Sequence, residues 1–401
     1  MKTIRGIHSG DWHSDKTEKR QSKLSESLDQ IVKYCEEVKV NFLIVPGDLY
    51  EVPQIFADNS GVPLLKKYLL KFSELVDYIF IVKGNNHHDS PGSISLLHQL
   101  RPNIYSYEYP VVLAVNGKEV EDILRTEDVS YEVIDDNVEY IISLVPYPTK
   151  ASLISEDSID NNNFNFIEKI SEVFEHIGNV TEGYNCPKIL GFHGNVTGAV
   201  ISKGQEIKGQ DIIIPISVIR KAKAHYNALN HIHKWQEIDE ISWYSGSPTH
   251  NNFGELEQKY FQVIEFDEKL NREIRSIPLT ATHPMVKLEG NFIDGEFVFT
   301  NDEEEIAVAK NPISEVWLKI SVKENERSIL TEEKKNYLVE TFGTTKIDYI
   351  TIPVERESRS EQIMHCKSLV DEVKEYAAVT EQPINGTIEK KVAEMQEGVS
   401  L

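Results

Sequence analysis

The sequence contains no apolar run of about 20 residues, which is the length that a helix needs to span a bilayer. The N-terminal segment MKTIRGIHSGDWH also lacks the apolar stretch of a signal peptide, so we expect a cytoplasmic protein with no membrane association. Only three cysteines occur among the 401 residues, and they are far apart: Cys35, Cys186 and Cys366. An odd number of isolated cysteines argues against a disulfide framework or a zinc site and favours a reducing compartment.

Basic residues are scarce relative to acidic ones, with 42 lysines and arginines against 65 aspartates and glutamates and a formal net charge of −23. A protein that binds nucleic acid through a broad basic face is expected to be cationic. Clustered metal ligands, however, are acidic until they are loaded, and a divalent cation reverses the local field. The charge therefore indicates that any contact with DNA is local or shared with a partner. The nucleotide-binding pattern GxxxxGK[ST] is also absent, so any ATP dependence must come from a separate ATPase.

The first hundred residues alternate short apolar strands with amphipathic helices. Strands are expected at 3–8, 41–45 and 78–82, and helices at 24–40 and 63–76. This βαβαβ order predicts parallel strands joined by right-handed crossovers. In such sheets, functional sites form beyond the carboxyl ends of the strands.

The rest of the chain is less regular, and its character changes near residue 281. Before that point we expect further strands and one helix, at 111–115, 140–145, 166–177 (the helix), 188–192 and 244–245, and a hairpin at 259–280. After it, FIDGEFVFT and VWLKISVKE alternate like strands, and apolar residues repeat at helical spacing in 361–377 and 387–397. We therefore predict a domain at 1–280, a small α+β domain at 281–355 and a helical tail at 356–401.

Metal-binding residue types follow the predicted strands at five places. They are Asp11 and His13 in GDWH, Asp48 in GDLY, Asn85 or Asn86 in KGNNHHD, His193 in GFHG, and His231 and His233 in NHIH. Two divalent cations about 3.5–4 Å apart can hold both the attacking water and the leaving oxygen of a phosphate ester. Imidazole, carboxylate and amide ligands together suit manganese or iron. The order of these motifs thus predicts a two-metal phosphoesterase.

Each motif alone has an ordinary structural explanation. Asp48 could cap a helix or a turn, and an Asn-rich turn needs no metal. A single histidine at a strand end, such as His193, is more often structural than a ligand. Asp11 and His13, like His231 and His233, are two positions apart, so extended backbone would direct each pair to one side. The five motifs together, each at a strand end, favour the metal site.

The chain resembles the calcineurin-type metallophosphoesterases and, within them, the SbcD-type nuclease subunits of SbcCD DNA repair and recombination complexes, whether bacterial or phage-encoded. GDWH, GDLY, GNNHHD, GFHG and NHIH carry the broad resemblance. The narrower one is carried by longer stretches, namely IHSGDWHSD, HDSPGSISLL, LVPYPTK, GFHGNVTGA, ALNHIHKWQ and WYSGSPTHNNFGE. They cover residues 1 to about 267, and the remainder matches the family's capping domain and C-terminal helices only in position and type.

The resemblance implies an α/β metallophosphoesterase sandwich of two mixed sheets flanked by helices, with a small α+β capping domain and a C-terminal helical tail. It implies two divalent ions, manganese first and magnesium or iron as alternatives. The implied ligands are Asp11, His13 and His233 for one ion, Asn85 (or Asn86), His193 and His231 for the other, and Asp48 as a bridge between them. His88 or His87 would stabilise the phosphorus centre or protonate the leaving oxygen.

The same resemblance implies partners and activity. We expect double-strand exonuclease and single-strand endonuclease activity on DNA, together with an SbcC-like P-loop ATPase docked on the C-terminal helices. A homodimer of this chain would then give a heterotetramer with the ATPase. The helices could equally pack on their own domain.

Three positions depart from the family pattern. The loop GNNHHD is two residues longer than the usual GNHD, so the sequence leaves open Asn85 or Asn86 as ligand and His87 or His88 as catalytic group. Asn230 stands where glycine usually precedes H-x-H, and Glu51 stands where relatives often have Asp or His. Two other functions also stay open: hydrolysis of another phosphodiester or of a phosphoprotein, and a degenerate scaffold without catalysis.

Overall fold

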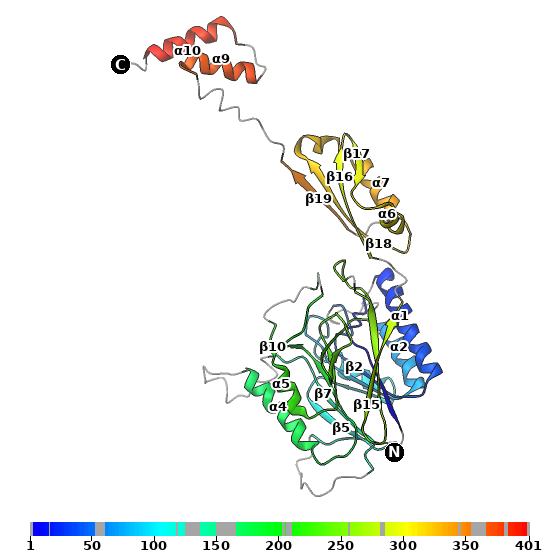
Figure 1. Cartoon of the computed structure of the whole chain (residues 1–401). Coiled ribbons are helices and arrows are strands. Elements are labelled where there is room, and N and C mark those ends of the chain that lie inside the picture. Colours follow the sequence, from blue (N-terminus) through cyan, green and yellow to red (C-terminus); the bar gives the residue numbers. More distant parts are fainter. Residues whose placement is uncertain are drawn as a thin grey trace. The chain divides into compact units, whose positions relative to one another are not determined.

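The computed structural model describes residues 3–15, 17–52, 61–117, 119–124, 137–149, 166–202, 205, 211–255, 257–280, 285–343, 346–353, 366–380 and 384–398. The chain forms two compact units, one of residues 1–287 with 307–317 and the other of residues 288–306 with 318–401 (Figure 1). Among the described residues, no helix has both the length and the apolar character required to cross a membrane.

A six-stranded sheet forms the first half of the first unit, in the order β15-β14-β1-β2-β3-β4. Its strands are β1 (Ile4–His8), β2 (Val40–Pro46), β3 (Val76–Val82), β4 (Ile104–Tyr107), β14 (Lys259–Phe266) and β15 (Arg272–Leu279). The first four run parallel, as the βαβαβ pattern predicts, and β14 joins β1 antiparallel. Helices α1 (Glu18–Glu37) and α2 (Gly61–Leu75) make the crossovers, and a short 3-10 helix η1 (Ser95–Gln99) precedes β4.

A seven-stranded sheet forms the second half, in the order β12-β13-β11-β8-β7-β5-β6. Its strands are β5 (Val111–Val115), β6 (Val120–Asp122), β7 (Tyr140–Val145), β8 (Lys188–His193), β11 (Tyr226–Asn230), β12 (Gln236–Asp239) and β13 (Ser242–Tyr244). Strands β7, β8, β11 and β13 run parallel. This part also contains α4 (Phe166–Val180), α5 (Ile216–Ile219), η3 (Arg220–Ala222) and the short pair β9 (Asn195–Val196) and β10 (Ile213–Ile214).

The two sheets pack face to face, and each carries helices on its outer face. In β2, Phe42 and Ile44 lie in the apolar cluster shared by both sheets, whereas Leu43 and Val45 lie in the cluster beneath α1 and α2. This alternation is the period of two expected of a strand. Because both faces of β2 are covered, the strand is apolar throughout. The fold is therefore the predicted α/β sandwich of two mixed sheets flanked by helices.

A four-stranded sheet follows, in the order β17-β16-β18-β19, with β16 (Met285–Ile293), β17 (Glu296–Phe299), β18 (Glu315–Lys323) and β19 (Lys346–Ile352). Helices α6 (Glu303–Ala309) and α7 (Glu332–Phe342) and the 3-10 helix η4 (Glu324–Ile329) connect its strands. The segment FIDGEFVFT, expected to be one strand, is instead a hairpin. Asp294 and Gly295 adopt φ of 51° and 86°, and these left-handed conformations turn the chain between β16 and β17.

Two helices end the chain, α9 (Leu369–Val379) and α10 (Gly386–Gly398), and they pack against each other (Figure 1). The Ser368 hydroxyl accepts a hydrogen bond of 3.1 Å from the Asp371 amide and so caps the first turn of α9. Lys374 Nζ lies 3.6 Å from Glu389 Oε1 across the pair. The predicted start of the first of these helices, at 361–365, lies outside the described residues.

Candidate metal centre

Five loops converge where the parallel strands of the two sheets end. The side chains that the sequence singles out follow these strands, and each is less than a tenth exposed: Asp11 and His13 after β1, Asp48 after β2, Asn85 after β3, His193 at the end of β8, and His231 and His233 after β11. Backbone bonds join the first two loops, with the Asp11 amide donating to Gly47 O (3.1 Å) and the His13 amide to Asp48 O (3.0 Å). Residues more than 200 positions apart thus share one buried cluster.

The backbone at this cluster adopts conformations that side chains rarely take. Asp11, His13 and Asp48 have φ of 50°, 47° and 50°, and His231 has φ of 111°. Non-glycine residues with positive φ are uncommon, and such strain concentrates at functional sites. Gly47, at φ 83°, permits the close approach of β2 to β8, since a Cβ there would lie 2.5 Å from His193 Nδ1. The loops are therefore shaped to bring ligand-type side chains together.

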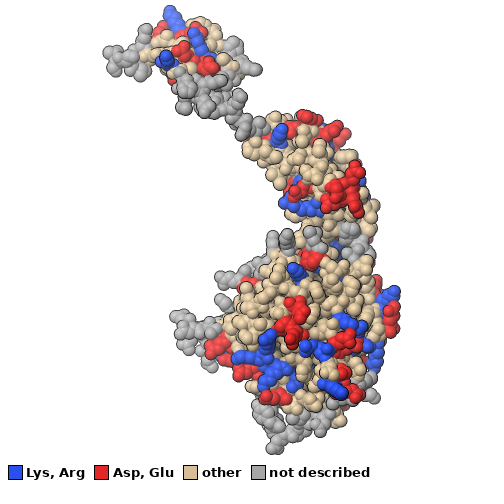
Figure 2. All heavy atoms as spheres, viewed as in Figure 1, with Lys and Arg blue, Asp and Glu red and all other residues tan. Residues whose placement is uncertain are grey.

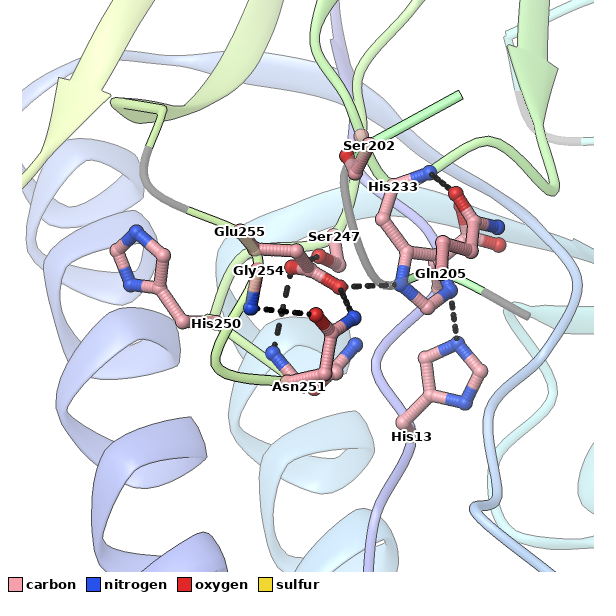
Figure 3. Close-up of polar contacts among 12 residues, drawn as sticks. His13, Ser202, Gln205, His233, Ser247, His250, Asn251, Gly254 and Glu255 are labelled. Carbon is pink, nitrogen blue, oxygen red and sulfur yellow. Dashed lines mark hydrogen bonds and ion pairs between the residues drawn. The ribbon is translucent and has the colours of Figure 1, made fainter. Parts of the chain in front are cut away.

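His13 and His233 face each other through their Nε2 atoms, which are 3.0 Å apart (Figure 3). The other ring nitrogen of each lies near a carboxylate. His233 Nδ1 bonds Glu255 Oε1 at 2.8 Å, and His13 Nδ1 lies 3.2 Å from Glu51 Oε2 without an aligned hydrogen bond. With both Nδ1 atoms protonated, the two Nε2 atoms present lone pairs to each other. A cation between them would remove this repulsion, and about 3 Å separates neighbouring nitrogen ligands on a metal with bonds of about 2.1 Å.

Asp48, His193 and His231 form a second group, and their ligand atoms all lie within 4.8 Å of one another. His193 Nε2 is 3.2 Å from Asp48 Oδ2, while its Nδ1 contacts the Pro46 carbonyl at 2.7 Å. His231 Nε2 lies 3.3 Å from Asp211 Oδ2. Asp48 also groups with Asp11 and His13 within the same limit, so this carboxylate can serve both groups.

At the centre, the pKa of each buried carboxyl or imidazole group depends on the charge of its neighbours. Burial alone would raise the pKa of Asp48, but the neighbouring His193 and His88 hold it well below its usual range. Burial would lower the pKa of His193, but the Asp48 carboxylate outweighs burial and raises it to about 9. Asp89 shows the opposite case, because burial and the Asp48 charge raise its pKa to about 6. In the metal-free chain, His193 thus keeps a proton beside the Asp48 carboxylate, and a bound divalent cation would take the place of that proton.

The loop GNNHHD divides into buried and exposed residues. Asn85 is buried beside Asp48, to which its backbone amide (2.9 Å) and its side-chain Nδ2 (2.8 Å) donate, while its Oδ1 accepts from the His87 amide (2.9 Å). The His88 ring stacks edge-on against His13, with ring centres 4.5 Å apart. Asn86 and His87 are exposed. The structure thus brings Asn85 and His88 to the cluster and leaves Asn86 and His87 outside it.

Several residues at the centre were not predicted from the sequence. Asp89 accepts hydrogen bonds from the amides of Asp48 (3.0 Å), Leu49 (3.1 Å) and Gly84 (2.8 Å), and so ties the β2 loop to the β3 loop. Its position next to His88 in HDSP was the available signal. Asp211 is joined to the centre by His231, the Tyr147 hydroxyl (3.1 Å) and Asn195 Nδ2 (2.8 Å), and no motif marked it.

Asn230 is a structural part of the site. Its Nδ2 donates to Asp11 Oδ2 at 3.0 Å, and its Oδ1 lies 2.7 Å from His8 Nε2. His8 is fully buried, and burial lowers its pKa to about 4, so it stays neutral and can donate to Asn230. The residue that replaces the usual glycine thus links a buried histidine to a candidate ligand.

The residues present fit divalent metal ions. Two buried imidazole nitrogens at the cluster, His193 Nε2 and His231 Nδ1, make no aligned hydrogen bond with the described residues, although Asp48 Oδ2 lies 3.2 Å from the first. Buried polar groups rarely remain in this state, and an ion is one accepted explanation. Carboxylates or carbonyls contact the opposite ring nitrogen of His193, His231 and His233, as is usual for histidines that bind metals.

Comparison with known proteins agrees with this interpretation. No protein-family model matches the sequence. Among curated proteins, the chain is 25% identical over 304 residues to the SbcD subunit of the SbcCD nuclease of Bacillus subtilis (strain 168), and the match covers 71% of this chain and 72% of that protein. One solved crystal structure aligns with 69% of this chain and 100% of its own at 12% identity, but its TM-score of 0.39 is too low to support an argument. The resemblance to SbcD-type proteins is thereby confirmed, as a distant one.

Proposed function

We propose that this chain, a distant relative of the SbcD protein of the SbcCD nuclease, is a metal-dependent nuclease subunit that hydrolyses DNA phosphodiesters with two divalent cations, manganese first. The observation that carries the proposal is the shared position of Asp48 in two buried groups of ligand atoms. The Nε2 atoms of His13 and His233, which face each other at 3.0 Å, support it.

In this proposal, Asp11, His13 and His233 would hold one cation, Asn85, His193 and His231 would hold the other, and Asp48 would serve both. Bound cations would lower the pKa of the attacking water and neutralise charge on the phosphate. Asn85 binds a cation through oxygen only if its amide turns, because Nδ2 is the atom that now contacts Asp48. Such a rotation would break the hydrogen bonds of Nδ2 to Asp48 and of Oδ1 to the His87 amide, so the cation would have to replace them.

His88 is the proposed catalytic group. Its Nδ1 contacts the Glu51 carbonyl at 2.7 Å, and a carbonyl can only accept, so Nδ1 carries the proton. Nε2 is then the nitrogen that can take up a proton and pass it to the leaving oxygen. His88 is half-buried beside His13, so it borders both the cluster and solvent.

The proposed partners follow from the same relationship. Residues 281–355 would cap the site and contact DNA, and residues 356–401 would bind an SbcC-like P-loop ATPase, in a heterotetramer built on a homodimer of this chain. On the face drawn in Figure 2, basic and acidic side chains are intermixed, without a single broad basic surface. DNA binding through a local contact or with a partner's help agrees with this pattern.

The test is manganese-dependent digestion of end-labelled linear duplex DNA by the wild type and by Asp48→Asn, His88→Ala and His87→Ala. We expect His88→Ala to lose at least about 100-fold in rate, as removal of a proton-transfer group typically does. Asp48→Asn should lose at least as much, because it removes the carboxylate charge that would serve both cations. His87→Ala, altered at an exposed position of the same loop, should stay within about twofold of the wild type.

Other outcomes would change the proposal. Loss of activity in His87→Ala but not in His88→Ala would reverse the catalytic assignment. Hydrolysis of a small aryl phosphodiester without DNA cleavage, even with the ATPase added, would indicate a different phosphoester substrate. Activity retained in Asp48→Asn would rule out the two-metal centre.

A further inference from the structure

We infer that Glu255, held in place by Lys259, is a positioning residue for His233, and that this buried pair determines whether His233 can bind a cation. The inference rests on the proposed metal centre and assigns a role to two residues outside it. Neither touches the proposed cations. Both act through the imidazole of His233.

Glu255 is buried deeply, with 1% of its surface exposed, and both of its oxygens accept hydrogen bonds (Figure 3). Oε1 accepts from His233 Nδ1 at 2.8 Å and from Asn252 Nδ2 at 2.7 Å. Oε2 accepts from Lys259 Nζ at 2.6 Å and lies within 3.4 Å of the Ser247 hydroxyl and the Asn251 amide. Lys259 Nζ and Glu255 Oε2 are both buried and form an ion pair at 2.6 Å, so Glu255 faces His233 as a carboxylate.

Lys259 contacts His233 a second time. Its Nζ donates to the His233 carbonyl at 3.1 Å and to the Ser247 hydroxyl at 3.1 Å, and the residue is 2% exposed. The pair therefore fixes His233 at two points, the ring through Glu255 and the backbone through Lys259. Gln205 adds a third, because its Oε1 accepts from the His233 amide at 3.1 Å.

An ionised carboxylate can only accept hydrogen bonds, so His233 must carry its proton on Nδ1. Nε2 is then left as a lone pair, and it faces His13 Nε2 at 3.0 Å. In metal-binding histidines, a carboxylate commonly accepts a hydrogen bond from the ring nitrogen that does not bind the metal, and this hydrogen bond fixes the tautomer. The arrangement of Glu255 thus makes His233 a ligand and not a donor.

A glutamine at position 255 would reverse this choice. The ammonium of Lys259 attracts the amide oxygen, which would turn the amide NH₂ toward His233 Nδ1. The imidazole would then have to accept at Nδ1 and carry its proton on Nε2, where it cannot bind a cation. If Lys259 is also replaced by methionine, this preference disappears and the glutamine oxygen can face His233 again.

A second buried ion pair in the same unit provides a matched control. Lys23 Nζ lies 3.0 Å from Glu315 Oε1, both side chains are 6% exposed, and Lys23 also donates to the His250 carbonyl at 3.0 Å. This pair resembles Glu255–Lys259 in burial and chemistry. In the described part of the chain, none of its hydrogen bonds reaches a candidate ligand.

The experiment is calorimetric titration of Mn²⁺ into the metal-free full-length chain, with thermal unfolding of each variant measured in parallel. The variants are Glu255→Gln, Glu255→Gln with Lys259→Met, and Glu315→Gln. We expect two sites in the wild type. Glu255→Gln should weaken one of them by about 10–100-fold, the range found for such supporting residues. The double variant should recover part of that loss, and Glu315→Gln should bind like the wild type.

Each other result has a distinct meaning. Wild-type affinity at both sites in Glu255→Gln would overturn the inference while leaving the proposed function intact. Equal loss in the single and double variants, in step with lowered thermal stability, would leave the pair with a structural role only and would also overturn it. Failure of the wild type to bind Mn²⁺ would remove the proposed metal centre, and the inference with it.

Discussion

His193 lies between Asp48 and Asp11, with no exposure to solvent. Its raised pKa, about 9, follows from these carboxylates outweighing burial. An imidazolium cannot bind a cation, so metal and proton compete for the same ring. The protonation of one residue therefore affects how strongly the whole centre binds metal.

This competition gives a pH dependence with a defined sign. Because the folded pKa of His193, about 9, lies above its ordinary value of 6.5, the ring is protonated at neutral pH in the metal-free chain. Mn²⁺ affinity should therefore rise by up to about tenfold per pH unit between pH 6.5 and 9, with release of about one proton per chain. Calorimetry in two buffers of different ionisation enthalpy measures both quantities. An affinity that does not change over this range would contradict the coupling.

The loops after β2 and β3 act together because they are packed with no space between them. A Cβ on Gly84 would lie 2.1 Å from Asp48 Oδ1 and 2.3 Å from the Asp48 backbone nitrogen. No real Cβ approaches so closely, and the backbone on both sides is fixed by hydrogen bonds to Asp89. The site geometry is therefore a property of the two elements and not only of the ligands they carry.

Gly84→Ala should accordingly displace Asp48 and abolish Mn²⁺ binding at both groups. We expect a destabilisation of about 1–3 kcal/mol, since overpacking of a close-packed site typically has this effect. Gly386→Ala is the control, because a Cβ at that helix position would meet no atom of the described residues within 4 Å beyond its own helix backbone. Thermal unfolding of both variants measures the destabilisation, and Mn²⁺ titration measures the loss of binding. Normal binding by Gly84→Ala would mean that Asp48 is not held as the contacts indicate.

At the scale of the whole molecule, the chain crosses between its two units more than once. Residues 307–317 belong to the first unit, although they follow β16 and β17 in the sequence. Within that unit, Glu315 pairs with Lys23 of α1, and Trp317 packs against Phe253 with ring centres 5.7 Å apart. Any shortened form of the chain must keep this segment to preserve the first unit.

Two shortened chains test this organisation. A chain ending at residue 355 should keep metal-dependent nuclease activity and lose association with the ATPase partner. A chain ending at residue 280 lacks residues 307–317, and with them the Lys23–Glu315 ion pair and the contact of Trp317 with Phe253, so we expect it to be less stable than the full chain by at least about 1 kcal/mol. Urea unfolding and co-purification with the ATPase distinguish them. Binding of the ATPase by the 355-residue form would disprove the role of the tail.

The sequence by itself determined the βαβαβ order of the first sheet and the order of the ligand-type side chains, and the family resemblance implied the two-sheet sandwich. Short apolar runs located β1 to β3, which are covered on both faces, and a period of 3.6 in the apolar residues located their helices, which bury one face. The same logic placed Asp48 and His193 at strand ends. The sequence could not decide between Asn85 and Asn86 as ligand or between His87 and His88 as catalytic group, because adjacent polar residues in a loop show no hydrophobic periodicity.

Only the tertiary structure decided which residues surround those ligands. Asp211 and Glu255 reach His231 and His233 from segments that no local pattern connects with them, and Lys259 lies on β14 in the other sheet. The hairpin at Asp294 and Gly295 is a different case, because Asp-Gly between apolar residues is a local turn signal that the prediction of one strand overlooked. Hydrogen bonds between distant segments form only when the two sheets pack together. The residues that form them therefore cannot be identified from a local sequence pattern.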